Sequence, residues 1–197
     1  MNDSDRTRAH DRAYQSERSS ERATTARRRI VPLALLAAAL GALHHLDHIV
    51  RANHVGWPVV PQVTPFTFSL LVYPLLLVGA YLTARHRVGA WYWLAISIPI
   101  LALVVNVHFN PAPEGEQVKD LYLPYAEPAA YCAKRSAADP PVGRSELCDP
   151  APSPGRPILG ALSVADMLAL VVTLIVLVVT SAREVWRARR TPAVGIL

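Results

Sequence analysis

The sequence predicts an all-α membrane protein whose four helices form a bundle across the bilayer, with both chain ends in the cytoplasm. Of its 197 residues, 52% are hydrophobic, which is high for a soluble domain. The hydrophobic residues gather in four blocks, each close to the roughly 20 residues that span the hydrocarbon core. Most of the 20 basic residues are Arg and lie between or beyond these blocks. The predicted spans are residues 30–50, 66–84, 89–109 and 158–182.

The Arg distribution orients the chain. Eight Arg precede the first span, Arg85 and Arg87 separate the second and third, and four follow the fourth. The positive-inside rule places all three segments in the cytoplasm, so the formal charge of +5 needs no nucleic-acid partner. Residues 1–29 mix these Arg with acidic residues and show no apolar periodicity, which predicts a disordered tail. Residues 183–197 form the second cytoplasmic tail. The lipid bilayer is the expected partner, and homo- or hetero-oligomers are compatible with the sequence.

The first span has an alternative. Its basic flank and apolar run resemble a signal peptide, but a leader that continues past residue 40 exceeds the usual 15–30 residues. We therefore expect the first span to be retained. The excess of Arg over Lys, with abundant Ala, Val and Pro, is typical of a high-GC bacterial genome and suggests the inner membrane.

The long segment 110–157, between spans three and four, is extracytoplasmic in this topology. Its ten prolines argue against regular helix over most of its length. In an oxidising compartment Cys132 and Cys148 are expected to form a disulfide, with free thiols or metal ligands as alternatives. The segment would then cap the outer end of the bundle. Pro74 and Pro99 are expected to kink spans two and three.

Polar residues enter the first span near its outer end. His44 and His48 are four residues apart and share a helix face with Gly41, Ala37 and Ala34, whose small size favours close packing. Both imidazoles should therefore point into the bundle. Because such residues are costly in lipid, they usually serve a function.

Depth along the helices suggests partners for these imidazoles. At about 1.5 Å per residue, His108 in span three and Asp166 in span four reach similar levels. The predicted metal ligands are therefore His44, His48, His108 and Asp166, for zinc, iron or copper. Asp47, His45 and Arg51 would support them from outside the ligand set. Ser163, Asp166 and Thr173 form a polar stripe on span four.

Three functions remain open at this stage. The first is a metal-dependent membrane enzyme whose substrate arrives from the outer leaflet or the periplasm. The second is a non-catalytic membrane subunit or scaffold in which Asp47 and Arg51 form an ion pair and the histidines only stabilise the bundle. The third, less favoured, is a bis-histidine haem or a proton relay. The sequence contains no Gly-rich phosphate loop and no motif of a serine hydrolase or zinc protease, so catalytic residues stay unassigned.

Overall fold

The computed structural model describes residues 3–51, 57, 61, 63–110, 118–138 and 155–190, in which all regular structure is helical. Four stretches are long and apolar enough to cross a membrane: Arg27–Arg51, Phe66–Ala84, Ala90–Phe109 and Pro157–Arg190. The predicted all-α architecture with four candidate spans is therefore confirmed. The helices are α1 (Asp3–Arg51), α2 (Pro65–Ser69), α3 (Val72–Ala84), α4 (Ala90–Phe109), α5 (Val118–Ala126), α6 (Pro128–Ala138) and α7 (Pro157–Arg190).

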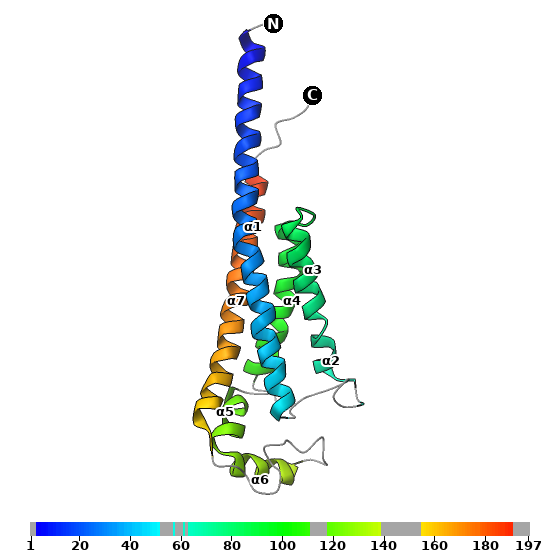
Figure 1. Cartoon of the computed structure of the whole chain (residues 1–197), viewed down its shortest axis with the longest axis vertical. Coiled ribbons are helices and arrows are strands. Elements are labelled where there is room, and N and C mark those ends of the chain that lie inside the picture. Colours follow the sequence, from blue (N-terminus) through cyan, green and yellow to red (C-terminus); the bar gives the residue numbers. More distant parts are fainter. Residues whose placement is uncertain are drawn as a thin grey trace.

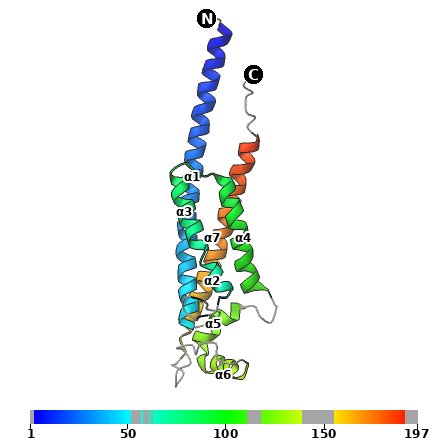
Figure 2. The same cartoon turned by 90° about the vertical axis from the view of Figure 1, so that its right-hand side faces the viewer.

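Helix α7 is the centre of the packing and contacts α1, α4 and α5, while α1 also packs on α3. Figures 1 and 2 show α5 and α6 at one end of the bundle and the projecting start of α1 at the other. We call these the cap end and the tail end. Helix α7 finishes at the tail end, so α1 begins and α7 ends on the same side of the bundle (Figure 1). Which side faces the cytoplasm stays a prediction.

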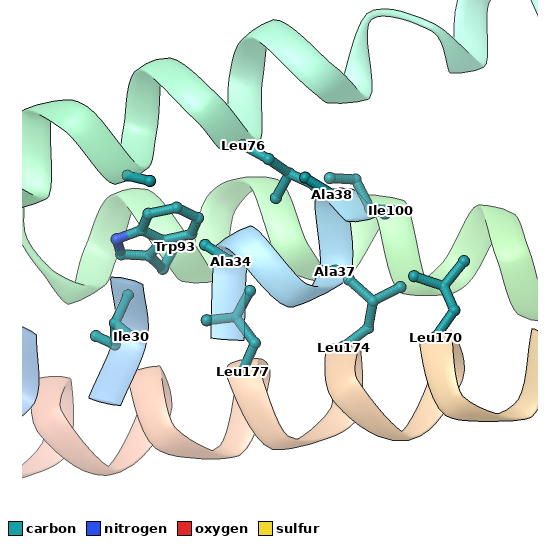
Figure 3. Packing of buried hydrophobic residues seen from close by; sticks show 11 residues of the cluster. Ile30, Ala34, Ala37, Ala38, Leu76, Trp93, Ile100, Leu170, Leu174 and Leu177 are labelled. Atoms are coloured by element: carbon teal, nitrogen blue, oxygen red, sulfur yellow. The ribbon is translucent and has the colours of Figure 1, made fainter. Parts of the chain in front are cut away.

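The hydrophobic core lies between α1, α3, α4 and α7, as Figure 3 shows. Ala34 and Ala37 are at most 1% exposed, and their small side chains let α1 approach its neighbours closely. The Trp93 ring is fully buried, and its Nε1 donates a hydrogen bond to Thr83 Oγ1 at 2.8 Å. The opposite faces of the helices carry exposed apolar side chains, as expected where a helix meets lipid: Leu35, Leu36, Leu77, Val78, Leu168 and Val172.

Residues 3–29, for which the sequence predicted a disordered tail, are helical in the structure. Helix α1 already begins at Asp3 and runs into the first span without a break. Ala and Arg, which are good helix formers, are common in this segment. The adjoining span also supplies a formed helix, so elongation avoids the cost of nucleation. The helix of this tail therefore continues that of the first span.

The second span is interrupted, as its proline suggested. Pro74 has no N–H to bond the Leu70 carbonyl, which instead accepts a hydrogen bond from Tyr73 N at 3.3 Å. The span therefore consists of α2 and α3 joined by a turn at Leu70 and Leu71. Pro99, in contrast, lies inside the continuous helix α4.

The predicted proline-rich loop contains two short helices, α5 and α6, that the sequence analysis did not anticipate. Pro128 stands at the first position of α6, where a missing N–H costs nothing. Cys132 lies on α6 and is not a free thiol. Cys148 lies outside the described residues, so the Cys132–Cys148 disulfide stays a prediction.

Helix α5 lies directly against α7 at the cap end. A Cβ atom on Gly160 would stand 2.7 Å from the Tyr122 backbone oxygen, closer than real Cβ contacts allow. Leu121 and Pro124 of α5 are buried. Glycine at position 160 is therefore what permits this close approach.

Candidate metal centre

The buried face of α1 continues toward the cap end as a line of polar side chains. Gly41 is buried, and the next residues on the same face are His44, His48 and Arg51, which are 5%, 6% and 0% exposed. The predicted inward direction of His44 and His48 is confirmed. It follows from the helical period, because residues four apart lie one above the other.

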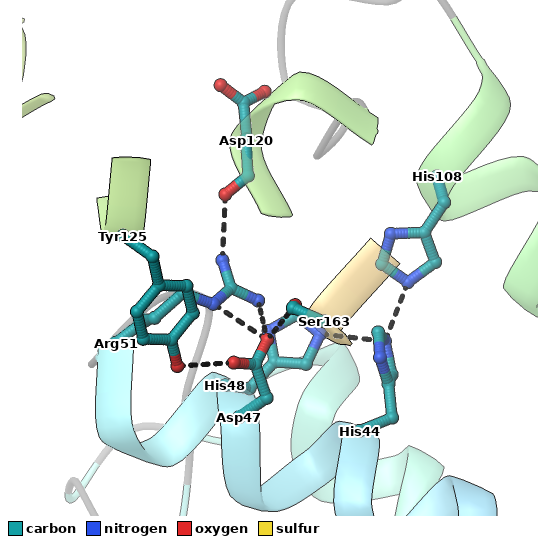
Figure 4. Close-up of polar contacts among 8 residues, drawn as sticks. All are labelled: His44, Asp47, His48, Arg51, His108, Asp120, Tyr125 and Ser163. Atoms are coloured by element: carbon teal, nitrogen blue, oxygen red, sulfur yellow. Dashed lines mark hydrogen bonds and ion pairs between the residues drawn. The ribbon is translucent and has the colours of Figure 1, made fainter. Parts of the chain in front are cut away.

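His108 reaches this face from the last turn of α4 and is 4% exposed. Its Nε2 lies 3.0 Å from His44 Nε2, and His48 Nε2 lies 3.1 Å from the same atom. Ligand atoms of all three residues lie within 4.8 Å of one another. Figure 4 shows His44 between the other two histidines, joined to each by a dashed line. We call His44, His48 and His108 the histidine cluster.

The two nitrogen–nitrogen distances that involve His44 suit a transition-metal ion, while the ligand atoms of the group as a whole spread over up to 4.8 Å. Metal–nitrogen bonds of about 2.0–2.1 Å in a tetrahedral site put neighbouring nitrogens about 3.3 Å apart. The two Nε2 separations of 3.0 and 3.1 Å are close to that value. Neutral imidazole is a suitable ligand for zinc, copper and iron. Three protein ligands would also leave one tetrahedral position open, as catalytic zinc sites do.

A bis-histidine haem fits less well. Its two axial nitrogens would stand about 4 Å apart with the macrocycle between them. His44 Nε2 lies within 3.1 Å of both other Nε2 atoms. The remaining pair of possible axial ligands is His48 and His108. The imidazole of His44 lies near both of them, where the macrocycle would have to be.

Asp47 belongs to a second buried group beside the histidine cluster. Its Oδ2 accepts hydrogen bonds from Arg51 Nε at 2.8 Å and Ser163 Oγ at 2.7 Å. Its Oδ1 accepts one from Tyr125 Oη at 2.5 Å. The Asp47–Arg51 ion pair expected from their spacing is present, with 2.8 Å between Oδ2 and the Arg51 NH2 nitrogen. Asp47 thus bonds Arg51, Ser163 and Tyr125, and its supporting role toward a histidine stays a prediction.

The Arg51 guanidinium also reaches α5, where its NH1 nitrogen donates to the Asp120 carbonyl at 3.0 Å. Burial, with the hydrogen bond to Asp47, raises the pKa of Tyr125, so its hydroxyl stays protonated and can donate. We call Asp47, Arg51, Ser163, Tyr125 and the Asp120 carbonyl the clamp (Figure 4).

His45 points to a different place from its neighbour His44. Its Nδ1 donates to the Gly41 carbonyl at 2.9 Å and contacts the Tyr73 hydroxyl, and its Nε2 lies 2.6 Å from Ser69 Oγ. The Phe66 ring lies near both His45 and His48, with ring centroids at 5.0 and 6.1 Å. The His45 ring also lies edge-on to the His44 ring, with centroids 6.4 Å apart, and its supporting role stays a prediction.

Asp166 is not among the residues that the structure brings together. The group whose ligand atoms lie within 4.8 Å of one another contains the three histidines without it. Among the described residues, Asp166 Oδ1 is buried without a hydrogen-bond partner, and the carboxylate interacts electrostatically with Asp47 and Tyr73. Depth along a helix does not fix the direction of a side chain around the helix axis, and the place of Asp166 as a ligand stays a prediction.

Two clamp groups and the partners of His45 were missed by sequence reasoning. Tyr125 and Asp120 come from the proline-rich segment, and Ser69 and Tyr73 come from the interrupted second span. The prolines were the only signal of these contacts in the sequence. Each proline lacks an N–H, so the carbonyl four residues before it has no partner within the helix and is open to another group. Comparison with known proteins adds no further assignment: no family model, curated protein or solved structure matches this chain.

Proposed function

We propose that this chain is a multi-pass membrane protein that holds one ion of zinc, iron or copper in the histidine cluster. The observation that carries the proposal is the convergence of three buried Nε2 atoms from two different spans. A hydrogen bond between two histidines would be enough to join α1 and α4. A third imidazole nitrogen is what a metal ion requires, because metal sites in proteins have three or four ligands.

The energetic argument points the same way. Burying a polar group in an apolar environment is costly unless its polar atoms find partners. His44, His48 and His108 are each at most 6% exposed inside or at the end of candidate spans. A metal ion would give all three Nε2 atoms a partner at once. Hydrogen bonds among the three imidazoles satisfy these atoms less completely.

The finer proposal is a metal-dependent membrane enzyme. An ion with three protein ligands can bind and activate water or oxygen at its remaining position. The substrate would arrive from the outer leaflet or the periplasm, because the cap end is the outer end in the topology that the Arg residues predict. Asp166 stays a candidate fourth ligand or acid–base group. The variant Asp166→Asn would test this role.

Metal analysis tests the proposal. The chain is purified in detergent, loaded in turn with Zn²⁺, Fe²⁺ and Cu²⁺, and freed of excess metal. We expect about one equivalent of one metal in the wild type and a loss of at least tenfold in His48→Ala. His86→Ala is the matched control, because His86 lies in the turn after α3 at the tail end and contacts Arg27 instead.

The alternative is a non-catalytic subunit whose histidines only stabilise the bundle. One observation favours it: His44 Nε2 lies within hydrogen-bond distance of both other histidines. A folded wild type that retains none of the three metals would decide for this alternative. A Soret band in the visible spectrum would instead move the assignment to haem.

A further inference from the structure

Helix α5 is fastened to α1 at two points. Near its start, the Asp120 carbonyl accepts the hydrogen bond from Arg51 at 3.0 Å. This carbonyl is open to Arg51 because Pro124, four residues later, has no N–H to bond it. Near the end of α5, the Tyr125 hydroxyl donates to Asp47 at 2.5 Å. These two hydrogen bonds therefore join α5, which packs on α7, to the last turns of α1.

The clamp is buried, which makes its geometry demanding. The Arg51 side chain is 0% exposed and that of Asp47 is 14% exposed. Both carboxylate oxygens of Asp47 are used, by donors from three helices. A buried ion pair of this kind is tolerated only when its remaining bonding positions are satisfied. Losing one donor therefore disturbs the whole group.

The clamp and the histidine cluster share two turns of α1. Asp47 lies between His44 and His48, and α1 ends at Arg51. The third ligand, His108, comes from α4, which packs on α7. Ser163 of α7 in turn bonds Asp47. The clamp thus fixes the outer turns of α1 relative to the helix on which α4 packs, and so sets the distances between the Nε2 atoms.

We propose that docking of α5 and metal binding are coupled through Asp47 and Arg51, so that the docked cap is a condition of tight metal binding. This inference rests on the proposed metal site. Thermodynamic linkage then requires the reverse effect, in which a bound metal strengthens the docking of α5 by the same factor. Tyr125 and Arg51 act here as positioning residues and touch no metal.

The first experiment compares two tyrosines of the same helix. The affinity of the purified full chain for Zn²⁺ is measured by competition with a chromophoric chelator. Tyr125→Phe removes only the hydroxyl that bonds Asp47, and we expect about tenfold weaker binding. Tyr122→Phe is the control, because its exposed ring packs beside Gly160 and its hydroxyl makes no hydrogen bond in the described structure. Its affinity should equal that of the wild type.

The second experiment measures the reverse effect. Hydrogen exchange of residues 118–126 is followed in the full chain with and without saturating Zn²⁺. We expect Zn²⁺ to slow this exchange by about the factor that Tyr125→Phe costs in affinity. His48→Ala should show no response to Zn²⁺. A purely structural Tyr125 would lower thermal stability in the absence of metal and leave both readouts unchanged.

The outcomes separate the two proposals. A wild type that binds no Zn²⁺, Fe²⁺ or Cu²⁺ overturns the proposed function and this coupling with it. A wild type that binds Zn²⁺ no more tightly than Tyr125→Phe overturns the coupling alone, as does exchange of α5 that ignores Zn²⁺. Weaker binding in Tyr125→Phe together with zinc-dependent protection of α5 supports both.

Discussion

The two ends of the bundle contain the same kinds of polar residue in opposite surroundings. At the cap end, Arg51 is 0% exposed and the three histidines of the cluster are at most 6% exposed. At the tail end, His86 is exposed and Arg27 only half-buried. His and Arg are therefore not informative by themselves. Their burial, and the partners that burial requires, distinguish a site from a solvated surface.

The partners at the tail end suit a membrane interface. Arg190 lies 3.5 Å from the centroid of the Trp186 ring, and Arg189 lies 4.9 Å from that of Trp91. Arg27 donates to the Ala84 carbonyl at 3.2 Å, in contacts that water can reach. Exposed Arg and Trp together are typical of the boundary between headgroups and hydrocarbon. The tail end thus has the composition of a membrane interface, whereas the cap end carries the candidate metal centre.

The largest difference between the two ends is expected when one Arg is removed from each. Arg51→Met leaves the largely buried Asp47 carboxylate without its counter-ion, and we expect a loss of about 3–5 kcal/mol in stability. Arg27→Met removes contacts that water can replace, so we expect little change. Thermal unfolding of both variants in the same detergent measures the difference. Equal stability of the two variants would contradict the distinction drawn here.

A smaller effect is expected at the contact between α5 and α7. Gly160→Ala places a methyl group against the Tyr122 backbone, where a Cβ would stand at 2.7 Å, so one helix must shift. We expect a loss of about 1–3 kcal/mol, the usual range for overpacking. Gly89→Ala is the matched control at the tail end, since no atom lies within 4 Å of its Cβ position. Faster hydrogen exchange in α5 for Gly160→Ala alone would locate the effect.

What could be predicted from the sequence follows from helix geometry. The inward direction of His44 and His48 depends only on the helical period, and the level of His108 depends only on the rise per residue. Both are properties of the backbone, so they hold before any tertiary contact is known. Three of the four predicted ligands therefore meet in the structure.

The remainder depends on contacts that a single sequence does not specify. A depth was predicted for Asp166, but the rotation of α7 about its axis is set by packing against its neighbours. Tyr125 reaches Asp47 only because α5 folds back onto α7, and this requires the close approach at Gly160. The long helical tail was missed for a similar reason, since its helix depends on the span that it continues.

The smallest expected effect concerns two serine hydroxyl groups. It tests whether burial or a hydrogen-bond partner contributes more to stability. Ser69 Oγ lies 2.6 Å from His45 Nε2, so Ser69→Ala leaves this half-buried imidazole nitrogen without its partner. We expect a loss of about 1 kcal/mol in stability. Ser97 is 0% exposed, and its hydroxyl has no hydrogen-bond partner in the described residues.

Ser97→Ala should therefore be neutral or slightly stabilising, because it removes a buried polar group that has nothing to bond. Thermal unfolding of the two variants, measured side by side with the wild type, gives the order. If Ser97→Ala were the more destabilising of the two, depth in the bundle would matter more than hydrogen-bond partners. The burial of polar groups at the cap end would then be no argument for a functional site there.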